Sequence, residues 1–212
     1  MDALTASDLI RLFDAWKTLF AEQRDFLIAL DGKVGDSDLG ITMSKSFAAA
    51  AEAVAAEGEA AGIAKLLRTA GATMARTAPS TMGTLTATGF LRASKAIETQ
   101  QSLGSSEMAA FWVAFRDGIA ERGKARVGDK TIVDVLDPVA RALERHAADG
   151  ASLATALAAA ADAAEEALEN TKSLVAQHGK AAAFQEKTVG LQDAGATVGA
   201  LLVRRLSDFV SA

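Results

Sequence analysis

Residues 31–46 read DGKVGDSDLGITMSKS and bring three acids next to the start of a helical pattern. Asp31, Asp36 and Asp38 lie within eight residues, and the glycines between and after them disfavour a helix there. Carboxylates this close together repel one another unless a cation neutralises them, so the stretch predicts a bound divalent metal ion. The alternative is a solvated acidic turn.

The metal predicted at these acids is Mg²⁺. A calcium loop of the EF-hand type does not fit, because the twelfth position counted from Asp36 is Phe47, and counted from Asp31 it is Thr42, where that loop has a glutamate. Magnesium is commonly held by a few carboxylates and completes its shell with water and phosphate oxygens. The helical pattern starts directly after Gly40, and a helix N-terminus favours phosphate. The stretch therefore predicts magnesium together with phosphate.

The composition favours one helical domain over residues 1–212. Half of the 212 residues are hydrophobic, only two are proline, and no segment alternates with period two. We predict an all-α domain of about eight helices, with the Phe and Trp residues in its core. The apolar spacing places helices near residues 6–22, 26–30, 41–56, 63–77, 85–91, 108–122, 132–143, 152–177 and 198–206, the span 152–177 being the longest.

Several classes of protein are excluded. A net charge of −5 provides no basic face for nucleic acid, and the absence of cysteine rules out disulfides and thiol catalysis. The two histidines, His146 and His178, lie in no recognisable catalytic triad. No apolar run approaches the ~20 residues that span a bilayer, and the first residues lack the pattern of a signal peptide. We therefore expect a cytoplasmic protein.

Four loops share small residues and a hydroxyl or acid just before a predicted helix. They are Asp38-Leu39-Gly40, Ser80-Thr81-Met82-Gly83, Gly128-Asp129-Lys130-Thr131 and Asp193-Ala194-Gly195. In an up-and-down helical assembly such loops gather at one end, where several helix N-termini form an anion site. The alternative is that each loop is an ordinary helix cap. Lys180, which follows His178-Gly179, is either a phosphate-binding charge or a solvated surface lysine.

Three motifs, in order along the chain, carry a resemblance to a known family. The first is Leu30-Asp31 with Gly35-Asp36-Ser37-Asp38-Leu39-Gly40, against Asp and then Gly-Asp-Gly/Ala-Asp-His-Gly in the family. The second is Arg122-Gly123-Lys124 with Gly128-Asp129-Lys130-Thr131, and the third is Gln192-Asp193-Ala194-Gly195-Ala196 against Asp-Pro-Gly-Ala. Over nearly its whole length the chain resembles the nucleotide-binding L subunit of bacterial dihydroxyacetone kinase, which is equivalent to the C-terminal domain of the single-chain, ATP-dependent enzymes.

The resemblance implies a barrel of antiparallel helices with ADP or ATP and a pair of Mg²⁺ ions at one end. By that resemblance Asp31, Asp36 and Asp38 ligate the magnesium, and Lys180 stands where the family often has a phosphate-facing arginine and has a catalytic role. The residues implied at the nucleotide are Leu39, Gly40, Ile41, Thr42, Ser80, Thr81, Met82, Gly123, Ile132, Lys180, Asp193, Ala194 and Gly195. Of these, Gly123 and Ile132 are expected near the base.

The function implied is donation of a phosphoryl group to a small ketose. In the family a histidine of a separate K subunit holds the sugar covalently, so the chain is expected to be one half of a kinase, active only with a K-type partner. The ketose is dihydroxyacetone or a related tetrulose. The phosphoryl donor is ATP or a phosphotransferase-system protein that recharges bound ADP. The oligomeric state, including a homodimer, stays open.

The chain also departs from the family pattern around the nucleotide. Leu39 stands where the family usually has His, Thr42 where it has Asn, and the turn Pro79-Ser80-Thr81-Met82-Gly83 where it has Gly-Gly-Ala-Ser-Gly. These changes leave the three acids intact while altering the walls of the nucleotide pocket, which indicates a divergent member. A non-catalytic nucleotide-binding or regulatory module with the same fold is the alternative function.

Overall fold

The computed structural model describes all residues from Met1 to Ala212 and contains nine α-helices and no strand. The helices are α1 (Ala6–Glu22), α2 (Arg24–Asp31), α3 (Leu39–Glu57), α4 (Ile63–Thr77), α5 (Thr81–Ala96), α6 (Ser105–Gly123), α7 (Ile132–Ala148), α8 (Leu153–Asn170) and α9 (Ala194–Ser211). Three 3₁₀ segments accompany them, η1 (Glu59–Ala61), η2 (Thr171–Ser173) and η3 (Ala181–Thr188). The predicted all-α fold is confirmed.

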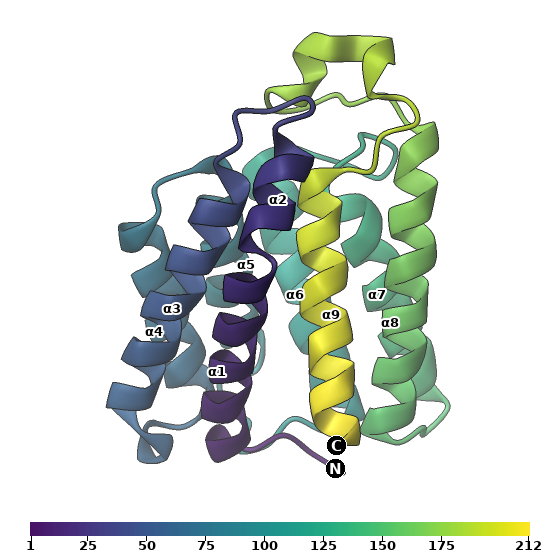
Figure 1. Cartoon of the computed structure of the whole chain (residues 1–212). Coiled ribbons are helices and arrows are strands. Elements are labelled where there is room, and N and C mark those ends of the chain that lie inside the picture. The colour runs from purple at the N-terminus through teal and green to yellow at the C-terminus, as the bar shows by residue number, and fades with distance from the viewer.

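Eight of the nine helices form a closed ring (Figure 1). From α3 onward each helix packs against the next in the chain, α9 returns to α1, and α1 packs against α3. The short helix α2 continues from α1 and packs mainly against α3. Both chain termini lie at one end of the ring, and the acidic stretch lies at the other (Figure 1). The prediction of a barrel of about eight antiparallel helices is therefore confirmed, with α2 as an additional short helix.

Aromatic side chains fill the ring. Phe13, Trp16, Phe47 and Phe90 are at most 2% exposed, and their rings lie 5.3 to 6.3 Å apart between centroids where they meet. Trp16 also donates its Nε1–H to the carbonyl of Leu202 at 3.1 Å. Because the indole donor is satisfied across the barrel, this bond joins α1 to α9 and fixes the closure of the ring.

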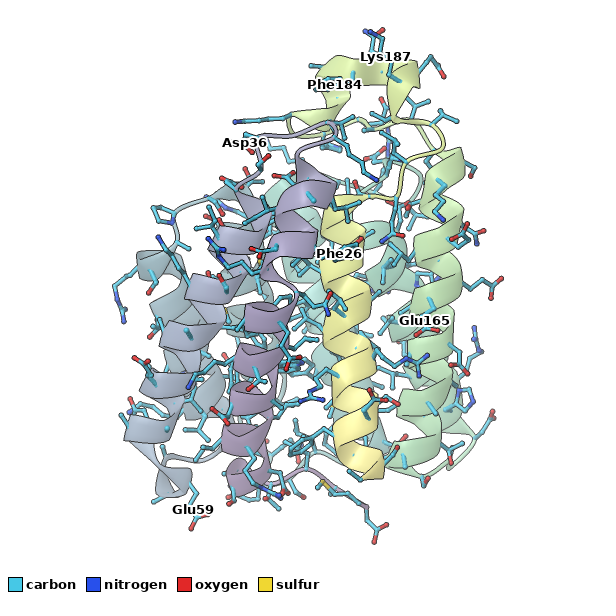
Figure 2. The ribbon with its side chains drawn as sticks, viewed as in Figure 1. Phe26, Asp36, Glu59, Glu165, Phe184 and Lys187 are labelled. Carbon is cyan, nitrogen blue, oxygen red and sulfur yellow. The ribbon has the colours of Figure 1, made fainter.

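Two aromatic residues do not lie in the core, contrary to the prediction. Phe26 on α2 is 48% exposed and Phe184 on η3 is 41% exposed (Figure 2). Both belong to segments outside the ring of eight helices. On α2 the neighbouring Leu27 and Leu30 are buried, so Phe26 lies on the face of that helix that is turned away from the protein. No helix combines the length and the apolar character that crossing a membrane requires.

Side-chain caps start the helices that open toward the acidic end. Ser80, Thr131 and Asp193 each accept a hydrogen bond from a backbone N–H in the first turn of α5, α7 and α9. At α7 the carboxylate of Asp134 accepts a hydrogen bond from the backbone N–H of Thr131 at 2.6 Å, which completes a capping box. Asp38 precedes α3 but makes no side-chain capping bond, so its carboxylate is free for other partners.

The predicted helix over 152–177 is too long, because α8 ends at Asn170 and its 18 residues are fewer than the 19 of α3 and α6. At Thr171 the buried hydroxyl donates to the carbonyl of Leu168 and accepts from the backbone N–H of Asp193. Leu174 is already extended. A side chain that bonds to the backbone in this way competes with continuation of the helix. Here the Thr171 hydroxyl also joins the start of the α8–α9 connection to Asp193 at the end of that connection.

Candidate functional site

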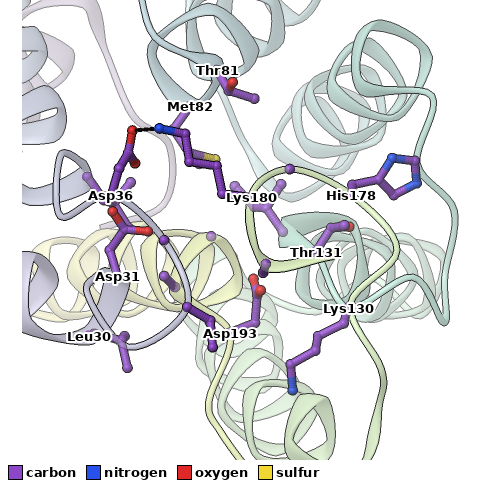
Figure 3. A pocket seen from close by; sticks show the side chains of 18 of the residues that line it. Leu30, Asp31, Asp36, Thr81, Met82, Lys130, Thr131, His178, Lys180 and Asp193 are labelled. Atoms are coloured by element: carbon purple, nitrogen blue, oxygen red, sulfur yellow. Dashed lines mark hydrogen bonds and ion pairs between the residues drawn. The ribbon is translucent and has the colours of Figure 1, made fainter. Parts of the chain in front are cut away.

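A cavity of about 220 Å³ opens at the end of the barrel that lies away from the chain termini (Figure 1), and Figure 3 shows the side chains that line it. Its walls come from the end of α2, the starts of α3, α5, α7 and α9, and the α8–α9 connection, residues 171–193. A second cavity, of about 620 Å³, is lined by Ser80, Arg122 and Gly123 and shares Asp38, Thr81 and Leu85 with the first. The four loops therefore gather at one end of the barrel, as predicted from the sequence.

The three acids of the first motif form one cluster. Carboxylate oxygens of Asp31, Asp36 and Asp38 all lie within 4.8 Å of one another, with Asp31 half-buried and the other two exposed. Asp31 ends α2, and its Oδ2 accepts the backbone N–H of Asp38 at 3.1 Å. A Cβ at Gly35 would overlap the Asp31 carboxylate, so only glycine fits there. The loop is thus folded so that three hard oxygen donors face the same point.

Lys180 reaches this cluster from the far part of the chain. Its ammonium forms an ion pair with Asp36 (Figure 3), and that hydrogen bond, together with the charges of the other two acids, raises the pKa of Lys180. Partial burial and the charges of Asp36 and Asp31 raise the pKa of Asp38, against the opposing effect of Lys180. One cation therefore stands against three acids, and the cluster keeps an excess of negative charge in the absence of a metal ion.

Asp193 lies on the floor of the cavity, between the acid cluster and α7 (Figure 3). Its Oδ2 accepts the backbone N–H of Ala196 at 2.7 Å as the cap of α9. The residue borders the cavity and keeps some accessible surface, but protein atoms surround most of its carboxylate. This burial raises the pKa of Asp193 to about 6, although the capping bond and the charge of Lys130 oppose the change.

Lys130 and His178 also line the cavity, and the sequence prediction gave neither of them a role in the site. Lys130 is 3% exposed, and its ammonium donates to the carbonyls of Thr171 and Leu191 at 2.6 and 2.7 Å. The ring of His178 is hydrogen-bonded to Asp129 at 2.9 Å. The Gly128-Asp129-Lys130-Thr131 motif pointed to this region, but the partners lie more than 40 residues away and have no local pattern.

Most of the residues predicted for the nucleotide border one of the two cavities. Those that line the first cavity are Leu39, Thr81, Met82, Ile132, Lys180, Asp193, Ala194 and Gly195, together with the three acids. Ser80 and Gly123 line the second. The structure thus brings residues from six segments of the chain, which were predicted to share one site, to two adjoining cavities.

Gly40, Ile41 and Thr42 were predicted at the nucleotide, and the structure does not bring them to either cavity. A Cβ at Gly40 would overlap the backbone carbonyl of Arg24, so this glycine allows α3 to pack closely against α2. Thr42 is 6% exposed and faces the protein interior, whereas Ile41 is 36% exposed and lies outside both cavities. Helical geometry explains the difference, because consecutive residues of the first turn of α3 point in different directions.

The chain is similar to known proteins over nearly its whole length. Residues 33–208 match the model of the DAK2 domain. The chain is 31% identical to the ADP-binding subunit DhaL of the PEP-dependent dihydroxyacetone kinase of Escherichia coli K12, over 97% of each chain. It is 36% identical to the D-erythrulose kinase of Mycolicibacterium smegmatis, over 95% of this chain but 35% of that longer protein.

A solved structure has the same fold. The crystal structure of the dihydroxyacetone kinase of C. freundii in complex with AMP-PNP and Mg²⁺ superposes with a TM-score of 0.71. The match covers 94% of this chain and 33% of that one, at 22% sequence identity. The closed ring of helices is therefore shared with one part of a larger protein.

Proposed function

The chain belongs to the DAK2-domain family, and from this premise we propose that residues 1–212 form the nucleotide-binding subunit of a dihydroxyacetone-type kinase. It is a kinase subunit of the DhaL type that carries ADP or ATP. In the proposed reaction it holds the nucleotide with Mg²⁺ and donates a phosphoryl group to a small ketose. The ketose is bound by a separate K-type subunit.

The observation that carries this proposal is the position of the acid cluster beside the cavity. Asp31, Asp36 and Asp38 lie at the rim of a cavity into which α5, α7 and α9 begin. Helix N-termini attract phosphate, whereas three carboxylates repel it unless a divalent cation lies between them. A magnesium-bound di- or triphosphate satisfies both requirements, and a bare phosphate or a bare cation satisfies only one.

The acid cluster fits magnesium by the chemistry of its donors. All three side chains offer hard oxygen ligands, and the close approach of Gly35 keeps Asp31 turned toward the other two. We propose that these three residues hold the magnesium, with two of them exposed enough to leave room for water and phosphate oxygens. When bound, the ion would neutralise phosphate charge during transfer.

Other residues of the chain would bind the phosphates and the nucleoside. Lys180, from the α8–α9 connection, would neutralise a phosphate oxygen, and the first turn of α9 would orient the phosphate chain. Met82 and Ile132 supply apolar walls for the nucleoside, and the adjoining cavity at Ser80 and Gly123 extends the space for it. Phosphoryl transfer depends mostly on such positioning and charge neutralisation, so this side of the reaction needs no nucleophile from the chain.

The sugar substrate is proposed from the relatives. Named relatives include dihydroxyacetone kinase subunits and erythrulose kinases, so the substrate class is a ketose of three or four carbons. The DhaL relatives of E. coli and Lactococcus lactis are described as PEP-dependent and PTS-dependent. We therefore propose two donors to be tested side by side, ATP itself and a phosphotransferase-system protein that rephosphorylates bound ADP.

Calorimetry of ADP binding to the whole chain tests the nucleotide and the metal together. Binding is expected with Mg²⁺ and is expected to disappear with EDTA. Asp36→Ala should abolish it while helical content by circular dichroism stays unchanged. Asp25→Ala is the matched control, because Asp25 is an exposed acid on α2 outside both cavities and should leave binding intact. Equal ADP affinity with and without EDTA would contradict the proposed site.

A phosphotransfer assay separates the kinase subunit from the non-catalytic module. The chain is combined with a candidate K-type subunit and with dihydroxyacetone or erythrulose, once with ATP and once with the phosphotransferase-system donor. Sugar phosphate formed only when both subunits are present supports the kinase. Magnesium-dependent ADP binding without turnover of either ketose, under conditions in which a known L subunit is active with the same partner, favours the module.

A further inference from the structure

We infer that Lys130 is a positioning residue that fixes both ends of the α8–α9 connection and, through it, the place of Lys180 at the cavity. This inference rests on the proposed nucleotide site. The two carbonyls that accept from its ammonium, those of Thr171 and Leu191, stand at the start and near the end of the connection. A single side chain from the connection between α6 and α7 thus joins two points that are 20 residues apart in sequence.

Further hydrogen bonds join the start of the α8–α9 connection to its end. The backbone N–H of Gly190 donates to the carbonyl of Lys172 at 2.7 Å, and that of Asp193 donates to the hydroxyl of Thr171 at 3.3 Å. Thr171 itself is fully buried. The ammonium of Lys130 lies at the same place and donates to two backbone carbonyls, of which that of Thr171 also accepts the backbone N–H of Leu174 at 3.1 Å and that of Leu191 has Lys130 as its donor. A methionine or leucine of similar length would fill the space, leave the Leu191 carbonyl without its donor, and leave the Thr171 carbonyl with only the backbone N–H of Leu174.

The burial of a charge at this position indicates a purpose beyond packing. Burial lowers the pKa of Lys130, while the charges of Asp193 and Asp134 oppose that change. An isolated buried ammonium is costly, so it persists only where carbonyls and acids compensate for it. One of those acids, Asp193, is the floor of the cavity. Lys130 therefore holds the two ends of the α8–α9 connection together and also balances the charge of Asp193.

The backbone supports the same conclusion. Lys130 has a φ of +59°, in the left-handed region that side chains other than glycine and asparagine rarely adopt. The residue lies between Gly128, which also has a positive φ, and the cap residue Thr131, and its side chain is buried. The adjacent Asp129 binds the middle of the same connection, through His178 and through the backbone N–H of Gln177 at 3.0 Å. Two consecutive residues thus hold the segment that carries Lys180.

Hydrogen exchange on the whole chain without nucleotide tests directly whether Lys130 holds the α8–α9 connection in place. In Lys130→Met the amides of residues 172–190 should exchange roughly ten- to a hundredfold faster, while amides in the centres of the helices keep their protection. Lys124→Met is the matched control. Lys124 lies in the same connection between α6 and α7, also has a positive φ, and is exposed with no side-chain hydrogen bond, so its replacement should leave the 172–190 amides unchanged.

Calorimetry with ADP and Mg²⁺ on the same variants adds the functional measurement. Lys130→Met should bind about tenfold more weakly than the wild type, and Lys124→Met should bind equally well. If the wild-type chain binds no ADP but Lys130→Met still speeds exchange in residues 172–190, the nucleotide proposal fails. The inference that Lys130 holds the α8–α9 connection is then still supported. If the wild type binds and the exchange in Lys130→Met equals that of the wild type, that inference fails and the nucleotide proposal stands.

A milder substitution covers the case in which Lys130→Met does not fold. Lys130→Gln keeps one donor group without the charge, and it should give exchange rates in residues 172–190 between those of the wild type and those of a fully released segment. Lys130→Arg keeps the charge and two or more donors, and should restore most of the protection and of the ADP affinity. Exchange that is equally slow in Lys130→Gln and the wild type overturns the inference, as does loosening spread evenly over all helices.

Discussion

On one side of the cavity Asp31, Asp36 and Asp38 hold three like charges close to water, whereas on the other side Lys130 and Asp193 hold opposite charges within the protein (Figure 3). The acidic side has an excess of charge that an exposed lysine offsets only in part. The buried side has its charges compensated by acids and backbone carbonyls. The first arrangement is suited to binding a cation, and the second to holding a segment in place.

The comparison predicts that the acidic side depends on close backbone approach. Gly35→Ala should displace the Asp31 carboxylate, because a Cβ at that position overlaps it. We expect magnesium-dependent ADP affinity to fall by roughly a thousandfold, equivalent to about 4 kcal/mol, since one carboxylate of the cluster no longer faces the other two. Calorimetry measures the loss, with unchanged circular dichroism showing that the helices remain.

Gly104→Ala is the control for this change. Gly104 precedes α6, has a φ of −78°, and lines neither cavity, so a methyl group there should not alter ADP affinity. If Gly35→Ala bound ADP as tightly as the wild type, the close approach of Gly35 to Asp31 would have no part in holding the metal.

On the buried side the expected effect is on stability and depends on pH. The pKa of Asp193 is raised from 3.8 to about 6 in the folded chain, so the folded state binds the proton more tightly than the unfolded state. Its contribution to stability is therefore fully present below about pH 4 and is lost as the pH rises through 6. The loss amounts to as much as about 3 kcal/mol of the free energy of unfolding.

Asp193→Asn isolates this contribution, because the amide oxygen can still accept the capping bond from Ala196. Urea unfolding at pH 4, 5, 6 and 7 should show a smaller fall in the free energy of unfolding for the variant than for the wild type over this range. Other acids such as Asp8, whose pKa is lowered in the folded chain, titrate in both proteins and cancel in the difference. Parallel curves for the two proteins would contradict a raised pKa at Asp193.

Lys180 joins the two sides, since it belongs to the segment held by the buried side and its charge lies on the acidic side. Lys180→Met should weaken magnesium-dependent ADP binding by roughly tenfold and leave the melting temperature unchanged, because the side chain is exposed. Lys33→Met is the matched control. It removes the same charge from the acidic loop itself, where Lys33 is exposed and forms no ion pair, and should have no comparable effect on binding. Equal losses in the two variants would show that only net charge matters.

The two sides also differ in how well the sequence predicts them. The acids of the cluster are at most seven positions apart, so their chemistry was evident from residues 31–38 alone. The helices followed from apolar spacing, their barrel arrangement from the resemblance to the family, and the caps at Ser80, Thr131 and Asp193 from their residue types. The tie at Lys130 was not predicted, because its partners lie 41 and 61 residues away and are backbone carbonyls, which every residue has. The end of α8 was misplaced for the same reason, since it depends on the distant Asp193.

The first turn of α3 gives the smallest expected effect and tests the limit of inference from resemblance. Leu39 and Ile41 were both predicted at the nucleotide, but Leu39 lines the cavity and Ile41 is exposed outside it. Ile41→Ala should therefore change magnesium-dependent ADP affinity by less than about twofold, as is usual for an exposed side chain away from a site. Leu39→Ala removes an apolar wall beside Asp38 and should cost roughly five- to tenfold. If the two variants lost affinity equally, the nucleotide would extend over the outer face of α3, and the cavity between α2 and α9 would be only part of its site.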